Sequence, residues 1–300
     1  MDPLATVTVL LPVFNGIPYI EEAIISVLSQ TFTDFEFLLI DDGSRDGTLQ
    51  LLQGWQARDG RIKVVVHETN RGLIASLNEG LSLATGKYIA RMDADDVCLP
   101  HRLQRQVEFM EAHPEIGVCG GQASYTGTGR ITTNPLDHEQ IKCFQLFWCA
   151  FTHPSVMMRK SVLDQYGIRY QPYPHAEDYD LWNRLAKVCG LVNLPDVLVV
   201  KRDHPAQVSV AHKPLQDHVA NLIRIEQLRE LGIEPTPEEF SIHLDFASYR
   251  IKVHDPVMHA KAALWAHKIM DANAGRGIYH PQKLKDFLGE CFQISARLQQ

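Results

Sequence analysis

Three carboxylates stand within four positions in the stretch ARMDADDVCLP, residues 90–100, directly after an apolar segment. Because side chains alternate along a strand, Asp93 and Asp95 are expected on one face, with Asp96 turned away. Two such carboxylates repel each other unless a cation neutralises them or one takes a proton. A site built from carboxylate oxygens suits Mg²⁺ or Mn²⁺, which keep positions open for water and phosphates. The alternative is a solvated turn that binds nothing.

The first hundred residues alternate between short apolar runs and amphipathic segments. Strands are predicted over 6–14, 35–40, 62–68 and 87–94, and helices over 17–32, 47–57 and 72–84. This order implies an α/β fold with a Rossmann-like, mostly parallel sheet flanked by helices. Ligands of such sheets bind at the carboxyl ends of the strands, where this chain is consistently polar. The polar exits are Asn15, Asp41 and Asp42, residues 68–71, and residues 93–96.

The second part of the chain is less regular. Strands are predicted over 116–125, 152–159 and 194–204, with a helix over 177–188. From about residue 214 the pattern is helical, and one apolar helix face is formed by Leu284, Phe287, Leu288 and Cys291. We therefore expect a catalytic domain over residues 1–212 and a helical C-terminal region over residues 213–300.

Composition excludes some classes of function. The net charge of −7 offers no basic patch for nucleic acid. The six cysteines show no C-x-x-C pair, which favours reduced thiols and a cytoplasmic location. No apolar run is long enough for a transmembrane helix, although peripheral contact with the inner face of a membrane stays open.

A series of motifs resembles the inverting family 2 glycosyltransferases of the GT-A fold. The resemblance spans roughly residues 5–210 and is specific in both order and spacing. It is carried by PVFNG at 12–16, SVLSQTF at 26–32, DDGSRDGT at 41–48, NRG at 70–72, MDADD at 92–96, HPS at 153–155, EDYDLW at 177–182 and RDHPAQVS at 202–209.

The resemblance implies a site for the nucleotide of a nucleotide-diphosphate sugar. Asp42 would accept a hydrogen bond from the base imide, or else form an Asx turn before Gly43. Arg71 would approach the base or a phosphate, or else be a solvated loop charge, and Arg91 would contact the nucleotide sugar or pair with the neighbouring acids. The full set implied for the nucleotide sugar is Pro12, Val13, Phe14, Asn15, Asp42, Asn70, Arg71, Gly72, Arg91, Asp93 and Ala94.

The resemblance also implies a divalent cation, Mg²⁺ or Mn²⁺, on the donor diphosphate. Asp95 would coordinate it directly, Asp93 would bind the metal, a water on it or the ribose, and His204 would add a ligand or a diphosphate contact. Lys201 and Arg202 would help to screen the diphosphate. Asp96 would cap the next helix or orient a ligand.

For transfer to an acceptor hydroxyl, the resemblance places the general base at Asp178, with Glu177 beside it for acceptor contact. Base catalysis contributes about 10²–10⁴-fold. The competing interpretation is that Glu177, Asp178 and Asp180 only complement a helix dipole. His153 is expected to shape the acceptor pocket or to fill structure.

Two other classes of function remain to be weighed. A sugar nucleotidyltransferase needs a basic, glycine-rich first loop, whereas PVFNGIPYIEE has one glycine and no Lys or Arg. A phosphatase with a D-x-D-x-T motif lacks its threonine here. A non-catalytic module that binds nucleotide sugars would be expected to have lost the base or the D-x-D, and both are present.

The expected acceptor is a glycan or a lipid-linked glycan, an implication of the family alone. The C-terminal helices have three open roles: to cover the acceptor side, to pair two subunits in a homodimer, or to rest on a membrane. Their polar faces mix both charges, so packing against the catalytic domain is the expected role.

Overall fold

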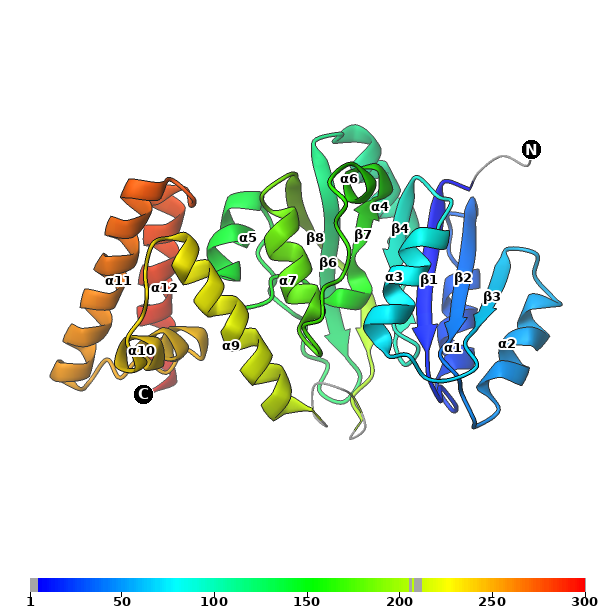
Figure 1. The fold of residues 1–300 in the computed structure, drawn as a ribbon, viewed down its shortest axis with the longest axis horizontal. Coiled ribbons are helices and arrows are strands. Elements are labelled where there is room, and N and C mark those ends of the chain that lie inside the picture. The colour runs from blue at the N-terminus through cyan, green and yellow to red at the C-terminus, as the bar shows by residue number, and fades with distance from the viewer. Residues whose placement is uncertain (1–4, 205–206, 208–211, 300) are drawn as a thin grey trace.

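The computed structural model describes residues 5–204, 207 and 212–299. Its centre is an eight-stranded sheet in the order β3-β2-β1-β4-β7-β6-β8-β5 (Figure 1). The strands are β1 (Val7–Val13), β2 (Phe35–Asp41), β3 (Ile62–Val66), β4 (Tyr88–Arg91), β5 (Val97–Cys98), β6 (Ile116–Tyr125), β7 (Met157–Arg159) and β8 (Gly190–Lys201).

The two halves of the sheet differ in strand direction. β3, β2, β1 and β4 are all parallel, as the alternation of strands and helices predicts. β7 runs antiparallel to both β4 and β6, β8 is parallel to β6, and β5 is antiparallel to β8. The predicted α/β fold is confirmed, with a parallel N-terminal half and a mixed second half.

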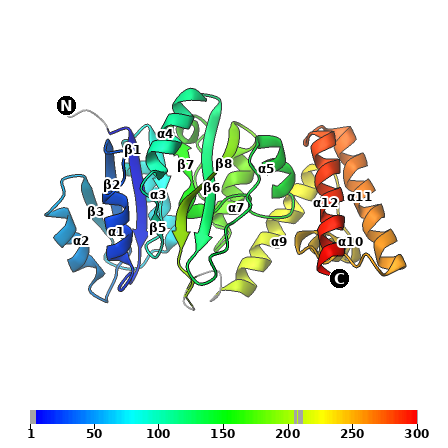
Figure 2. The same ribbon diagram turned by 180° about the vertical axis from the view of Figure 1, so that it is seen from behind.

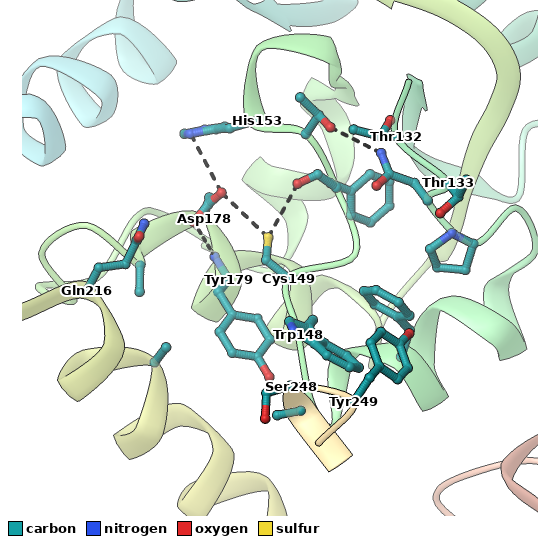
Figure 3. A pocket seen from close by; sticks show the side chains of 18 of the residues that line it. Thr132, Thr133, Trp148, Cys149, His153, Asp178, Tyr179, Gln216, Ser248 and Tyr249 are labelled. Carbon is teal, nitrogen blue, oxygen red and sulfur yellow. Dashed lines mark hydrogen bonds and ion pairs between the residues drawn. The ribbon is translucent and has the colours of Figure 1, made fainter. Parts of the chain in front are cut away.

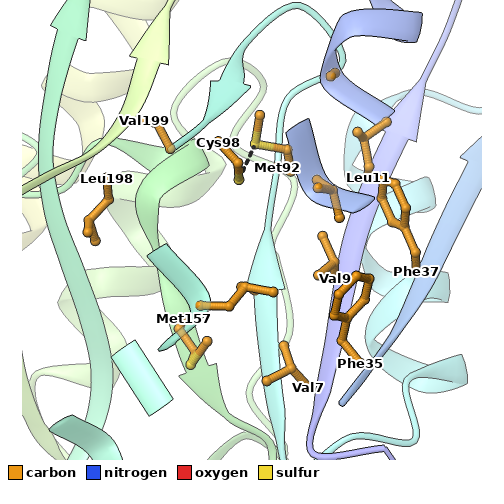
Figure 4. Packing of buried hydrophobic residues seen from close by; sticks show 14 of the residues in the cluster. Val7, Val9, Leu11, Phe35, Phe37, Met92, Cys98, Met157, Leu198 and Val199 are labelled. Carbon is orange, nitrogen blue, oxygen red and sulfur yellow. Dashed lines mark hydrogen bonds between the residues drawn. The ribbon is translucent and has the colours of Figure 1, made fainter. Parts of the chain in front are cut away.

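Helices cover both faces of the sheet because its strands are apolar on both faces. Val9 and Leu11 of β1 pack into a cluster with α1, α2 and α4 (Figure 4). Leu10 packs on the opposite face, in a cluster with Leu77 of α3. These helices, with the others of the first 200 residues, are α1 (Ile20–Leu28), α2 (Thr48–Gln56), α3 (Leu73–Leu83), α4 (Arg102–Ala112), α5 (His138–Gln145), α6 (Lys160–Gln165) and α7 (Glu177–Leu185).

The C-terminal helices are α9 (Lys213–Glu230), α10 (Pro237–Ala247), α11 (Pro256–Arg276) and α12 (Pro281–Leu298). Figures 1 and 2 show α10, α11 and α12 gathered at the end of the molecule opposite β3 and α2. They share a third core in which Phe246, Trp265 and Leu288 pack with Leu146 and Phe147, just after α5. The expected packing against the preceding domain is therefore found, and the predicted apolar face of α12 lies in this core.

Several predicted boundaries are wrong. The strand predicted over 87–94 ends at Arg91, a 3₁₀ turn at His153–Ser155 precedes β7, and β8 ends at Lys201, before His204. Helices α4, α5 and α6 and strand β5 are found in addition to the predicted elements. Among the described residues, no helix has the length and apolarity needed to span a membrane.

Candidate active site

The acids that follow β4 lie in a turn between β4 and β5. One ligand oxygen each from Asp93, Asp95 and Asp96 lies within 4.8 Å of the others, so all three carboxylates converge. The prediction that Asp96 turns away from the pair is wrong, because the alternation of a strand does not extend into this turn.

Asp96 is the most buried of the three, with 2% of the residue exposed. Its Oδ1 accepts a hydrogen bond from the backbone N–H of Arg202 (2.9 Å), and its Oδ2 lies 3.6 Å from Lys201 Nζ. Burial raises the pKa of Asp96 to about 7, with Lys201 opposing the shift. The prediction that Asp96 caps the next helix is wrong, because the N-cap of α4 is His101. Asp96 instead ties the acidic turn to the end of β8.

The other two acids each have a nitrogen partner. Arg91 is buried and its Nη1 lies 2.5 Å from Asp93 Oδ1, so the expected pairing of Arg91 with the acids is found. Burial raises the pKa of Asp93, but the charges of Arg91 and Lys201 outweigh it and lower that pKa to about 2. His204 Nε2 lies 2.8 Å from Asp95 Oδ2. The contact of Arg91 with a nucleotide sugar stays a prediction.

This residue set fits a divalent cation. Converging carboxylate oxygens are the ligands that Mg²⁺ and Mn²⁺ prefer, and an imidazole nitrogen stands beside them at His204. The Arg202 guanidinium donates from Nε to the backbone carbonyl of Asp95 (3.0 Å), pairs with Glu22 and lies 4.9 Å from the ring centroid of Tyr19, and its role in screening a diphosphate stays a prediction. The rest of the motif that contains His204, namely Pro205, Ala206, Val208 and Ser209, lies outside the described residues.

Asp42 organises the neighbouring loop. Its carboxylate accepts hydrogen bonds from the backbone N–H groups of Arg71 and Gly72, both at 2.8 Å, and lies 2.6 Å from His67 Nδ1. The Asx-type turn belongs instead to Asp41, whose Oδ2 accepts from the N–H of Ser44. Asp42 thus positions the loop that carries Asn70 and Arg71, and its contact with a base stays a prediction.

The predicted nucleotide-binding residues at the end of β1 differ from one another in burial. Pro12 and Val13 are buried in the strand, with Val13 in the core, whereas Phe14 is 48% exposed. The side-chain Oδ1 of Asn15 accepts from the backbone N–H of Arg45 (2.8 Å) and so joins this strand end to the loop after β2. Of the loop residues, the Arg71 guanidinium pairs with Glu79, and Ala94 packs partly into the first core.

The second acidic group opens α7. Asp178 Oδ2 lies 3.6 Å from Cys149 Sγ and 4.0 Å from His153 Nδ1 (Figure 3). His153 in turn contacts the Tyr170 hydroxyl through Nε2, at 2.9 Å. Burial raises the pKa of Asp178 and lowers that of His153 well below its usual value, which favours a neutral imidazole there.

Glu177 differs from its neighbour. It is 5% exposed, and burial together with the charge of Asp178 raises its pKa to about 7. Asp180 pairs with Arg184 one turn further along the helix (2.6 Å). Only Asp178 of these three acids lines the large cavity described next, so the predicted acceptor contact of Glu177 has no support from the cavity lining.

A cavity of about 1060 Å³ connects the two acidic groups. It is lined by Asp93 and Lys201 from the acidic turn and its surroundings, and by Asp178, His153 and Cys149 from the α7 side. Asp178, whose pKa is raised, and Asp93, which lies in a candidate cation site, therefore face one space. This arrangement can hold a ligand with one end at the metal site while a second ligand approaches Asp178.

Sequence reasoning missed two groups of cavity residues. Cys149 lies in FQLFWCAF, which has the composition of ordinary core, so no local signal marks it. Trp148 and Tyr249 line the same cavity from segments that are distant in sequence. Among the described residues all six cysteines are free, as expected.

Comparisons with known proteins identify the family and the fold. The family model described as "Glycosyl transferase family 2" matches residues 8–167. An uncharacterized glycosyltransferase of Haemophilus influenzae is 34% identical over 251 residues, covering 78% of each chain. The amylovoran biosynthesis glycosyltransferase AmsE of Erwinia amylovora is 35% identical over 61% of this chain and 70% of its own.

Solved structures share the fold at lower identity. S. aureus TarS 1-349 in complex with UDP-GlcNAc has a TM-score of 0.62 and 18% identity, covering 98% of this chain and 92% of that chain. The mannosyltransferase PcManGT of Pyrobaculum calidifontis, in complex with GDP-Man and Mn²⁺, has a TM-score of 0.58 and 17% identity, covering 98% and 87%. The GT-A fold of these structures is thus shared over nearly the whole chain. By the family model and the relatives, this protein is a glycosyltransferase that belongs to glycosyl transferase family 2.

Proposed function

We propose that the protein transfers a sugar, with inversion, from a nucleotide-diphosphate sugar to a hydroxyl group of a glycan or lipid-linked acceptor, with the help of Mg²⁺ or Mn²⁺. UDP is the proposed carrier. The observation that carries the proposal is the single cavity that reaches both Asp93 in the acidic turn and Asp178 at the start of α7.

Asp95, Asp93 and His204 would hold the cation. The close approach of their ligand atoms supports this set, since Asp95 and Asp93 lie in one carboxylate cluster and His204 lies on Asp95. When bound, such a cation neutralises the donor diphosphate and the negative charge that develops on it as it leaves. Two structural neighbours named above support a nucleotide-sugar donor, because they are complexes with UDP-GlcNAc and GDP-Man.

Asp178 would act as the general base. It would take the proton of the acceptor hydroxyl as that oxygen attacks the anomeric carbon and the bond from that carbon to the diphosphate oxygen breaks. Its raised pKa supports this role, because a base works best when its pKa approaches the working pH. Cys149, a thiol donor, would orient the carboxylate.

The loop at residues 70–72, held by Asp42, and the residues at the end of β1 would bind the nucleoside. The fixed loop geometry supports the proposal, since two backbone N–H groups of the loop are held at 2.8 Å by one buried carboxylate.

Release of free nucleoside diphosphate tests the function without knowledge of the acceptor. A panel of UDP-, GDP- and dTDP-sugars is incubated with the protein and Mg²⁺ or Mn²⁺. We expect slow, metal-dependent hydrolysis of at least one donor, and a chelator should abolish it. If no donor is hydrolysed and none binds in a metal-dependent way, the catalytic proposal fails.

A further inference from the structure

The large cavity has a region that the proposed chemistry does not use. There it is lined by the rings of Trp148 and Tyr249, whose centroids lie 4.6 Å apart at an interplanar angle of 34°. In Figure 3 these rings lie together near Ser248, while His153 and Asp178 lie toward the other side of the same space. Trp148 directly precedes Cys149, and Cys149 contacts Asp178, so one of the two rings belongs to the chain neighbour of a residue that contacts the proposed base.

The two rings come from the two parts of the chain. Trp148 follows α5, whereas Tyr249 follows α10 of the C-terminal region. Phe144 supports Trp148 from behind, with ring centroids 5.3 Å apart, and Phe287 of α12 lies 6.0 Å from Phe144. The C-terminal helices thus complete one wall of the cavity, in addition to forming their own core.

Tyr249 has an unusual backbone for a residue with a side chain. Its φ is +52°, in the left-handed region, and strained residues of this kind collect at functional sites. Among the described residues, its hydrogen bond runs from its backbone N–H to the carbonyl of Phe246 (3.2 Å), which leaves the hydroxyl available to a ligand. Both rings are only partly buried, so each presents surface to the cavity.

The remaining lining decides which kind of ligand suits these rings. Among the described residues, five Lys or Arg side chains and five Asp or Glu side chains line the cavity. Because the charges balance, the cavity has no excess of cations to bind an anionic lipid headgroup. Its many polar side chains also make it unsuitable for an acyl or prenyl chain. A sugar ring matches both features, because its C–H face stacks on an aromatic ring while its hydroxyls bind polar groups at the rim.

We propose that Trp148 and Tyr249 form a binding subsite for a pyranose ring of the acceptor glycan, a ring other than the one whose hydroxyl reaches Asp178. The volume of about 1060 Å³ lies at the upper end for small-molecule sites, which leaves room for more than one sugar ring. The inference deepens the proposed function, on which its identification of the ligand as an acceptor rests. The C-terminal helices, by supplying Tyr249, would then help to select the acceptor.

Binding of simple glycosides tests the subsite without catalysis. Saturation-transfer NMR is recorded on the whole protein with methyl β-D-glucopyranoside, methyl β-D-galactopyranoside and methyl N-acetyl-β-D-glucosaminide. Tyr249→Asn removes the ring but suits the left-handed backbone, so the variant should fold. Tyr166→Asn, at an exposed tyrosine outside the cavity, is the matched control.

We expect at least one glycoside to bind the parent, with an affinity that falls about three- to tenfold in Tyr249→Asn and is unchanged in Tyr166→Asn. Asp178→Asn should retain this binding. Thermal unfolding of each variant checks that the fold is intact, and Trp148→Leu should give the same loss from the other ring.

Three results would overturn the subsite: no glycoside binds the parent, the folded Tyr249→Asn variant binds as well as the parent, or decyl phosphate binds in a Tyr249-dependent way while the glycosides do not. Metal-dependent UDP binding is measured on the same samples. If UDP fails to bind while the glycosides still require Tyr249, the proposed donor chemistry fails and the sugar subsite stands.

Discussion

The acidic turn after β4 and the acidic start of α7 use the same type of side chain in opposite surroundings. In the turn, Asp93 is paired with Arg91 and Asp95 with His204, each at close range. At α7, Asp178 accepts a hydrogen bond from the backbone N–H of Tyr179 and lies near the Cys149 thiol and the poorly basic His153 imidazole. The turn compensates the negative charge of Asp93, whereas at α7 no Lys or Arg among the described residues pairs with Glu177 or Asp178, although Asp180 pairs with Arg184.

The difference teaches how one fold can assign two tasks to carboxylates. Compensation lowers the pKa of Asp93 to about 2, which keeps it ionised and ready to bind a cation. Burial raises the pKa of Asp178, so that this carboxylate takes up a proton more readily than an ordinary aspartate. Surroundings, and not residue type, separate the proposed metal site from the proposed base.

The largest expected effect is at Asp178. Asp178→Asn keeps the shape of the side chain but cannot accept the proton, so transfer should fall about 10²–10⁴-fold. Donor affinity, measured by calorimetry with UDP and Mn²⁺, should stay within about twofold of the parent. If transfer survives at the parental rate, Asp178 is not the base and the contrast between the two regions has no catalytic meaning.

At the acidic turn the opposite pattern is expected. Asp95→Ala removes a proposed metal ligand, so affinity for UDP in the presence of Mn²⁺ should fall on the order of a hundredfold, and transfer should fall with it. Asp271→Ala, at an exposed position on α11, is the control and should bind as the parent does. Equal affinity in Asp95→Ala and the parent would remove the metal assignment.

Glu177 offers a stability test of the same contrast. Its pKa is about 7 in the folded chain against an ordinary 4.5, so it does not weaken the fold well below pH 4.5, stability falls as the pH rises from 4.5 to 7, and the full loss persists above pH 7. Glu177→Gln should therefore raise the free energy of unfolding by about 2 kcal/mol at pH 8 and leave it unchanged near pH 4. Urea unfolding at both pH values measures this, with the exposed Glu68→Gln as control. If Glu177→Gln were instead less stable than the parent at pH 8, the negative charge of Glu177 would be compensated in the folded chain.

The smallest effect is expected from Cys149. Burial raises the pKa of this thiol well above its usual value, so it remains a neutral hydrogen-bond donor to Asp178. The base must be ionised, so transfer falls as the pH drops through the raised pKa of Asp178. This fall is the acid limb of the profile of transfer rate against pH. In Cys149→Ala the lost donor should move the limb to higher pH by about half a pH unit, and in Cys149→Ser a stronger donor should move it to lower pH by about the same amount. Identical limbs in both variants would exclude a positioning role for Cys149.

The sequence by itself determined the family, the N-terminal half of the sheet and most candidate residues. Strand–helix alternation predicts parallel strands with polar exits at one edge, and the motifs from PVFNG to RDHPAQVS identify the family by order and spacing. The pairing of Asp93 with Arg91 also followed from local sequence, since only one residue lies between them in the chain. Local patterns succeed where neighbours in the chain are also neighbours in space.

Only the tertiary structure decided the convergence of Asp96 with its neighbours, the loop-holding contacts of Asp42, and the Cys149 contact to Asp178. It also decided that Tyr249, from the C-terminal helices, stacks with Trp148 in the cavity that Asp178 lines. These contacts join segments up to about a hundred residues apart, and their partners are set by packing of whole elements. The residue types in one segment do not determine which distant segment will pack against it. The proposed acceptor side of the cavity could therefore be identified only in the folded chain.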